Sequence, residues 1–116
     1  MPLRDWRVRA MDIIEAAERA SSYVKGLTFE QFIADSRNVD ATSYAILVIG
    51  EAANSIPEQL VEAAPEVPWA DIRGMRNRVA HEYFGVDLVV LWHTVVEDLP
   101  QLQTTFRVLL DRSDSP

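Results

Sequence analysis

One stretch of the chain carries most of the side chains that could act on a phosphodiester. Between residues 73 and 85 the sequence reads RGMRNRVAHEYFG, which gathers Arg, Asn, His and Tyr beside a predicted helix end. A histidine takes up or releases a proton near neutral pH, and arginines supply fixed positive charge for an anionic transition state. These are the groups that metal-free RNA cleavage requires, with the 2′-hydroxyl of the RNA as the nucleophile.

The helical repeat limits how these side chains can meet. At about 100° per residue, Arg76 and Tyr83 share one helix face and Asn77 and His81 share another. Arg76 and His81 are about 140° apart, so one helix alone does not bring both to one phosphate. They meet if the helix unwinds before Gly85, if the arginine wraps around the helix, or if a second copy of the helix faces the first across a two-fold axis.

Two neighbouring arginines allow more than one interpretation. Arg78 has Glu82 four residues later, and an ion pair between them is one interpretation. Arg73 is aligned with Asn77 and could extend a track of phosphate-binding groups towards His81.

The sequence gives little support to metal or thiol chemistry. It has no cysteine, and neither of its two histidines follows a Glu by three residues, as a carboxylate di-iron site in a helical bundle requires. We therefore expect no metal and no cofactor. His93 precedes Glu97 by four residues, and we expect a partly exposed ion pair there and no catalytic role.

Charge and hydropathy narrow the class of protein further. Eleven basic and eighteen acidic residues give a net charge of -7, which argues against binding long nucleic acid by bulk charge. Any site for a polyanion must therefore be local. The apolar run 45–50 is far shorter than the roughly 20 residues that cross a bilayer. The charged N-terminus does not resemble a signal peptide, so we expect a cytoplasmic protein without membrane contact.

Apolar periodicity predicts helices throughout. We expect a first helix over residues 3–25, stopped by Gly26, and a short second helix with a Thr28 and Gln31 capping box that ends near Ser36. A third helix, over residues 41–56 with Asp40 as its cap, is apolar nearly all round and should be the most buried element.

The second half of the chain continues the pattern. Ser55 and Glu58 have capping-box spacing around Pro57, which predicts a short helix up to Ala64. A fourth long helix should run from Trp69 to residue 83 or 84, with Gly85 as its left-handed cap. Asp87 should cap a fifth helix that bends at Pro100. The core stripes of these helices are predicted at Ile72, Met75 and Val79, and at Leu88, Leu91, Trp92, Val95, Leu99, Leu102, Phe106, Leu109 and Leu110.

Together these elements predict an all-α fold, an up-and-down four-helix bundle with short additional helices. The length of 116 residues fits a single domain, which we place at residues 1–112, with a disordered tail at 113–116. The tryptophans Trp6, Trp69 and Trp92 should serve core and interface packing.

The motif stretch also resembles a known family. Residues 76–83, RNRVAHEY, match the R-x4-6-H-x-Y pattern of the HepT-like toxins of the HEPN superfamily. Residues 49–53 resemble the central-helix signature of that family, and residues 69–76 resemble its approach to the motif. Residues 84–87 and 92–100 resemble the family's segments C-terminal to the motif, so the resemblance covers nearly the whole chain.

The resemblance implies a homodimeric helical bundle that acts as a ribonuclease toxin. Arg76 and His81 of both subunits would line a shared cleft and act on an RNA substrate. The implied partner is a minimal nucleotidyltransferase antitoxin, which silences the toxin by transferring AMP to Tyr83. Glu51 would be a supporting group that orients His81 or an arginine, although a purely structural carboxylate is the other interpretation. The alternative to an enzyme is a non-catalytic dimeric helical module that binds a nucleotide or the partner protein through the same cleft.

Overall fold

The computed structural model describes residues 5–80 and 87–114, and it leaves out the side chains of residues 5, 76, 78–80, 113 and 114. Within these ranges the chain forms helices and no strand. The helices are α1 (Asp5–Val24), α2 (Phe29–Ala34), α3 (Ser36–Asn54), α4 (Glu58–Ala63), α5 (Trp69–Ala80), α6 (Leu88–His93), the π-helical segment η1 (Thr94–Asp98) and α7 (Leu99–Asp114).

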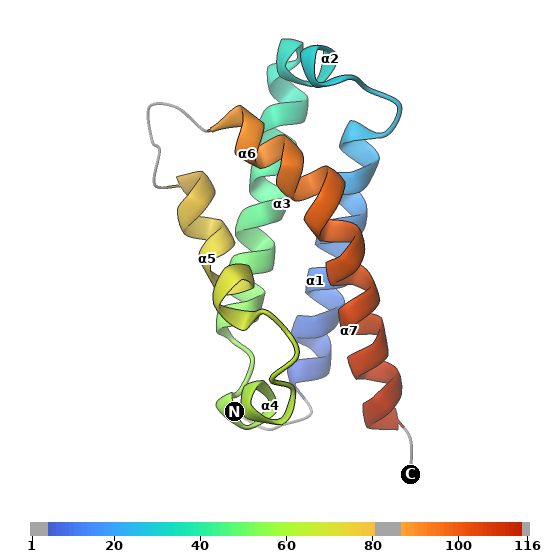
Figure 1. Cartoon of the computed structure of the whole chain (residues 1–116), viewed down its shortest axis with the longest axis vertical. Coiled ribbons are helices and arrows are strands. Elements are labelled where there is room, and N and C mark those ends of the chain that lie inside the picture. The colour runs from blue at the N-terminus through green and yellow to red at the C-terminus, as the bar shows by residue number, and fades with distance from the viewer. Residues whose placement is uncertain (1–4, 81–86, 115–116) are drawn as a thin grey trace.

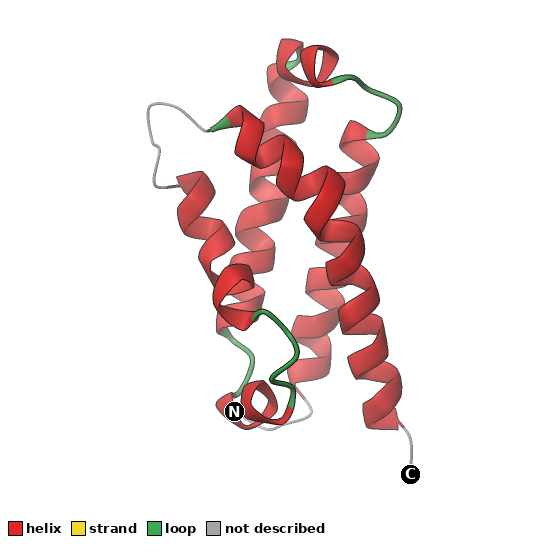
Figure 2. Ribbon diagram, viewed as in Figure 1, coloured by secondary structure: helices red, strands yellow, loops and turns green. Residues whose placement is uncertain are grey.

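The long helices run alternately up and down beside one another (Figure 1). α3 packs against both α1 and α5, and α7 packs against α1. The short helices α2 and α4 lie at opposite ends of the bundle, and α6 continues through η1 into α7 (Figures 1 and 2). This arrangement confirms the predicted all-α, up-and-down bundle with short additional helices.

The core lies between the facing stripes of α1, α3, α5 and α7. Alanines on α1 and α3 allow these two helices to pack closely, and larger side chains fill the remaining space. The largest fully buried apolar side chains are Phe32, Phe106, Ile13, Ile14, Ile46, Ile49, Ile72, Leu91, Leu99 and Val95. The rings of Trp69 and Phe106 meet edge to face, with 5.6 Å between their centroids, and join α5 to α7.

Three of the predicted helix boundaries are confirmed. Thr28 and Gln31 form a reciprocal capping box at the start of α2. Asp87 caps α6 by accepting a hydrogen bond of 3.0 Å from the Val90 amide. Gly26 follows α1 with a φ of 77°, a left-handed conformation in which a glycine has no Cβ to clash.

The predicted start of the third helix was wrong. α3 begins at Ser36, because the side chain of Asp35 accepts the Arg37 amide at 3.0 Å and so caps the helix one turn before Asp40. Asp40 lies inside α3. α3 packs against both α1 and α5, and on its outer side Tyr44 is 65% exposed.

The predicted capping box at Ser55 was wrong as well. The Ser55 hydroxyl donates to the Glu51 carbonyl at 3.1 Å and so ends α3 without starting the next helix. Pro57 is the N-cap residue of α4 and makes no side-chain cap. The Ser55 hydroxyl is therefore used by the Glu51 carbonyl of α3 and does not cap α4.

The helix changes from α-helical to π-helical just before Pro100. The Leu99 amide donates to the Thr94 carbonyl, five residues back, so η1 is wound wider than an α-helix. Pro100 is the second residue of α7 and has no amide to donate to the preceding turn, which is the π-helical one. α7 continues through Ser113 and Asp114, past the boundary expected at residue 112.

Candidate active site

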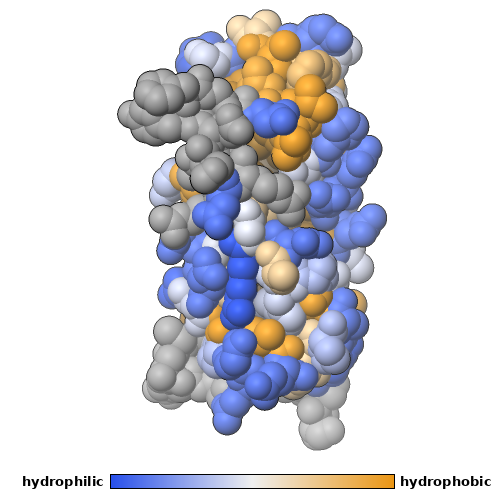
Figure 3. Space-filling model, turned by 60° about the vertical axis from the view of Figure 1, so that its left-hand side comes forward, coloured by the Kyte–Doolittle hydropathy of each residue, from blue (hydrophilic) through white to orange (hydrophobic). Residues whose placement is uncertain are grey.

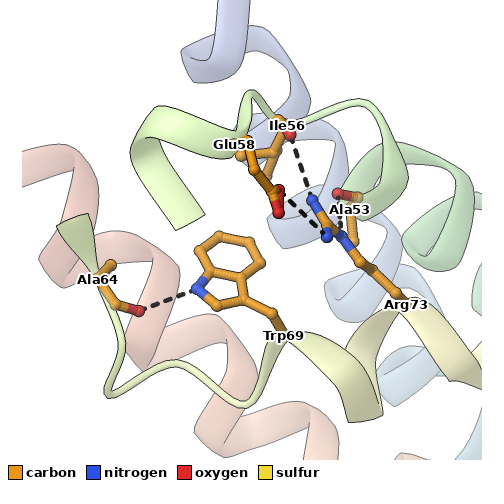
Figure 4. Close-up of polar contacts among 6 residues, drawn as sticks. All are labelled: Ala53, Ile56, Glu58, Ala64, Trp69 and Arg73. Atoms are coloured by element: carbon orange, nitrogen blue, oxygen red, sulfur yellow. Dashed lines mark hydrogen bonds and ion pairs between the residues drawn. The ribbon is translucent and has the colours of Figure 1, made fainter. Parts of the chain in front are cut away.

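α5 carries the first half of the motif, and three buried side chains set its rotation in the bundle. Trp69, Ile72 and Met75 point into the core and are 7%, 1% and 4% exposed. The indole Nε1 of Trp69 donates to the Ala64 carbonyl at 2.9 Å, which anchors the start of the helix to the preceding loop (Figure 4). The prediction of Ile72 and Met75 as core positions is confirmed, while the Val79 side chain lies outside the described part of the chain.

The side chain of Arg73 reaches from α5 to the end of α3 (Figure 4). Its Nε donates to the Ala53 carbonyl at 3.2 Å, and one terminal nitrogen donates to the Ile56 carbonyl at 3.3 Å. The other terminal nitrogen lies 3.7 Å from a carboxylate oxygen of Glu58. The guanidinium carbon is 6.0 Å from the centre of the Trp69 ring. The structure therefore directs this guanidinium towards the carboxyl end of α3.

The structure describes the other motif residues only in part. Arg76 and Asn77 lie in the second half of α5, and the Asn77 side chain is exposed. The Arg76 side chain, His81, Tyr83 and Gly85 lie outside the described residues. The convergence of Arg76 and His81 on one phosphate is therefore still a prediction.

Glu51 lies on the exposed side of α3, in a shallow groove of about 390 Å³. The groove runs between α1 and α3 and is lined by Arg9, Asp12, Tyr44, Leu47, Val48, Glu51, Ala52 and Ser55. Arg9 and Asp12 form an ion pair of 3.1 Å within it. This surface was not predicted from the sequence, although Tyr44, Leu47, Val48 and Glu51 follow helical spacing on the side of α3 that faces away from the core.

The face that carries α5 is mostly hydrophilic, with its largest apolar area at the end of the bundle with α2 and α6 and smaller apolar areas towards the other end (Figure 3). A second groove, of about 590 Å³, separates α5 from α7. Its described lining residues are Glu66, Pro68, Asp71, Ile72, Met75, Asp98, Gln101, Leu102 and Thr105, and among these three are carboxylates and none is basic. The three carboxylates disfavour an RNA backbone beside them.

The pKa of Glu66, at one end of that groove, is held below its usual value. The first cause is a hydrogen bond from the residue's own backbone amide, and the second is the Arg112 guanidinium, 2.9 Å from the carboxylate. Both favour the charged form, so the Glu66 carboxylate keeps its negative charge in mildly acidic solution.

The remaining sequence-based expectations concern His93 and metals. Nδ1 of His93 lies 3.2 Å from a carboxylate oxygen of Glu97, and both side chains are more than half exposed, which confirms the expected surface pair. The described residues hold no cluster of His, Asp and Glu side chains arranged to bind a metal ion. None of the described helices combines the length and the apolar character that a membrane span needs.

Comparison with known proteins identifies the class. The family model described as "Ribonuclease HepT-like" matches residues 13–109. "Probable ribonuclease HepT" of Thermococcus cleftensis is 41% identical over 98 residues, which cover 84% of this chain and 89% of that protein. "Putative RNase TTE0752" of Caldanaerobacter subterraneus subsp. tengcongensis is 34% identical over 100 residues, covering 86% of this chain and 89% of the relative.

A third relative extends the similarity over nearly the full chain. "Putative RNase MJ1216" of Methanocaldococcus jannaschii is 33% identical over 114 residues, which cover 95% of this chain and 91% of that protein. No solved structure matches the chain. The chain belongs to the HepT-like ribonuclease family.

Proposed function

We propose that this protein is a metal-independent ribonuclease that cuts RNA with Arg76 and His81. The observation that carries the proposal is the family match over residues 13–109, within which the sequence keeps an Arg, a His and a Tyr at the spacing R-x4-H-x-Y. The names of the three relatives, each of which contains "ribonuclease" or "RNase", support the same reaction class.

The proposed reaction uses the RNA's own 2′-hydroxyl. One imidazole takes the 2′-hydroxyl proton as the 2′-oxygen forms a bond to phosphorus. The bond from phosphorus to the 5′-oxygen breaks, and a protonated imidazole gives its proton to that oxygen. The products are a 2′,3′-cyclic phosphate and a 5′-hydroxyl, while Arg76 balances the charge that develops on the phosphoryl oxygens. Asn77 and Glu51 support the site by orienting these groups.

The proposed active unit is a homodimer. Arg76 and His81 are about 140° apart around an ideal helix, so two copies of the motif facing each other across a two-fold axis bring both residue types to one cleft. A dimer also supplies two copies of His81, one for each of the two proton transfers.

The proposed biological setting is a toxin with an enzymatic antitoxin. In this proposal a minimal nucleotidyltransferase modifies Tyr83 with AMP. The added phosphate then occupies the place of the RNA phosphate beside Arg76, which switches off the nuclease.

A cleavage assay in EDTA tests the nuclease. The purified protein should cut single-stranded RNA, and His81→Ala and Arg76→Ala should each lower the rate by at least about a hundredfold, because they remove a proton-transfer group and the fixed charge. His93→Ala is the matched control, since His93 is an exposed histidine paired with Glu97, and it should leave the rate unchanged.

Light scattering on the same samples checks the assembly, and all three variants should keep a mass twice that of the 13.1 kDa chain. Full activity in His81→Ala, or activity that EDTA abolishes, contradicts the assignment. Nucleotide binding without any cleavage favours the alternative, a non-catalytic binding module.

A further inference from the structure

The contact between α5 and α3 has a feature that the motif alone does not reveal. Arg73, on α5, donates to the carbonyls of Ala53 and Ile56 at 3.2 and 3.3 Å. Ala53 belongs to the last turn of α3, two residues beyond Glu51, and Arg73 lies three residues before Arg76. One side chain therefore links the two segments that the sequence singles out.

Arg73 adds a charged donor at the carboxyl end of α3. The Ala53 carbonyl also accepts the Ile56 amide at 3.3 Å, and the last carbonyls of a helix form the negative end of the helix dipole. A guanidinium supplies several donors in one plane together with a positive charge, and hydrogen bonds from a charged donor are stronger than neutral ones. Arg73 is thus suited to cap α3 from a neighbouring helix.

The same surroundings argue against Arg73 as a phosphate ligand. Its Nε and one terminal nitrogen are used by carbonyls, and the Glu58 carboxylate lies 3.7 Å from the other terminal nitrogen. A phosphate at this place meets a negative carboxylate and competes with two carbonyls for the donors of the guanidinium. The side chain is also only 26% exposed, with its guanidinium near the Trp69 ring.

We propose that Arg73 is a positioning residue: by holding α5 against the end of α3, it sets where Arg76 and Asn77 stand relative to Glu51. This inference rests on the proposed ribonuclease function for its effect on RNA cleavage. Arg76 lies about 4.5 Å further along the helix axis than Arg73, so a shift or rotation of α5 at Arg73 carries over to the motif with little attenuation. Misplacement by about 1 Å can cost a catalyst on the order of a hundredfold in rate.

The test separates positioning from phosphate binding by salt dependence. We would measure, for wild type and Arg73→Ala, the single-turnover cleavage rate at saturating RNA and the dissociation constant of a single-stranded RNA over a series of salt concentrations. Each lost phosphate contact lowers the slope of log affinity against log salt by about 0.7 for a single strand. Arg37→Ala is the control, because Arg37 is a 91% exposed arginine at the opposite end of α3.

Positioning predicts a cleavage rate lowered by about tenfold or more in Arg73→Ala, with a salt slope equal to that of wild type and of Arg37→Ala. Arg73→Lys keeps the charge and should recover part of the rate, because an ammonium can still donate to one of the carbonyls. A slope reduced by about 0.7 with an unchanged rate at saturation overturns the proposal and makes Arg73 a phosphate ligand. An unchanged rate with an unchanged slope overturns it too.

Amide hydrogen exchange tests, without RNA, whether Arg73 holds α5 against the end of α3; we call this contact the clamp. In Arg73→Ala, exchange should become faster in α5 and in the last turn of α3, while α1 and α7 keep their protection. If Arg73→Ala does not fold, Arg73→Lys should show the same local effect to a smaller extent. Unchanged exchange in α5 contradicts the clamp. A wild-type protein that cuts no RNA contradicts the proposed function and leaves the clamp to be decided by exchange alone.

Discussion

Two buried threonines provide a matched comparison of hydroxyl groups in the core. Thr42 on α3 is fully buried, and its Oγ1 has no hydrogen-bond partner among the residues that the structure describes. Thr94 in η1 is 5% exposed, and its hydroxyl donates to the Val90 carbonyl at 2.8 Å. A buried hydroxyl without a partner has lost its hydrogen bonds to water and gained none in the protein.

Thr42→Val should therefore stabilise the protein, by about 1 kcal/mol, since it removes an unsatisfied polar group and keeps the side-chain shape. Thr94→Val removes a hydrogen bond and should be neutral or destabilising. Urea denaturation followed by circular dichroism measures both variants. A lower midpoint for Thr42→Val than for Thr94→Val contradicts this account of Thr42.

Arg73 shows which side-chain contacts cannot be predicted from a sequence. Its alignment with Asn77 on one helix suggested a phosphate track, and the local spacing supports that interpretation. The carbonyls that it binds belong to Ala53 and Ile56, at least 17 residues away in the chain. Helical spacing predicts which residues are neighbours on the same helix, but it cannot predict a contact with a backbone carbonyl of another segment.

At the scale of elements, the N-terminus of α3 allows a direct test of which residue caps the helix. The residues before the apolar part of α3 read DSRNVD, so four of six positions hold residue types that cap helices well. Composition alone does not choose between Asp35 and Asp40. The choice depends on where the chain leaves α2, and the compact turn at Asp35 connects the two helices directly.

Asp35→Ala should lower the urea midpoint at pH 6, and Asp40→Ala should change it little, because only Asp35 caps the helix. The Arg37 amide, and then the Arg37 side chain, hold the pKa of Asp35 below 3.8. Its stabilising contribution is therefore fully present above about pH 4 and is lost as the pH falls through the lowered pKa of the folded state. The difference between wild type and Asp35→Ala should shrink at pH 3. A difference that grows on acidification contradicts this role.

At this scale the cap at Asp87 could be predicted from local sequence, whereas the form of the helix at Pro100 could not. Asp87 is followed by an apolar stripe and acts as a cap through its own side chain, so local sequence is sufficient. Pro100 predicts an irregularity but not its form. The wider turn of η1 closes with the bond from the Leu99 amide to the Thr94 carbonyl, and Val95 and Leu99 are both buried in the core.

At the scale of the whole molecule, the fold followed from apolar periodicity, whereas the site that we propose depends on a second molecule. The core positions at Ile72, Leu91 and Phe106 follow from spacing along single helices, and the structure buries all three. In the proposed homodimer Arg76 and His81 meet across a two-fold axis, and a partner leaves no periodic pattern in one sequence. Resemblance to a family supplied that expectation where spacing could not.

The switch proposed at Tyr83 is also a property of an assembly, since it needs the antitoxin, ATP and the toxin together. The phenolic oxygen forms a bond to the α-phosphorus of ATP, pyrophosphate leaves and the phenolic proton passes to solvent. Co-expression with the antitoxin should therefore raise the toxin's intact mass by one or more AMP units, and Tyr83→Phe should prevent the increase.

Tyr44→Phe is the matched control, because Tyr44 is a 65% exposed tyrosine on α3, and exposure alone should not attract the transferase. If selection depends on the motif, Tyr44→Phe keeps the full mass increase and Tyr83→Phe loses it. The phosphate on Tyr83 should also compete with RNA for Arg76, so the modified protein should bind RNA with a smaller salt slope than the unmodified one. If an active antitoxin leaves the wild-type mass unchanged, inhibition by transfer of AMP to Tyr83 is excluded. That result favours inhibition by steric blockade of the cleft.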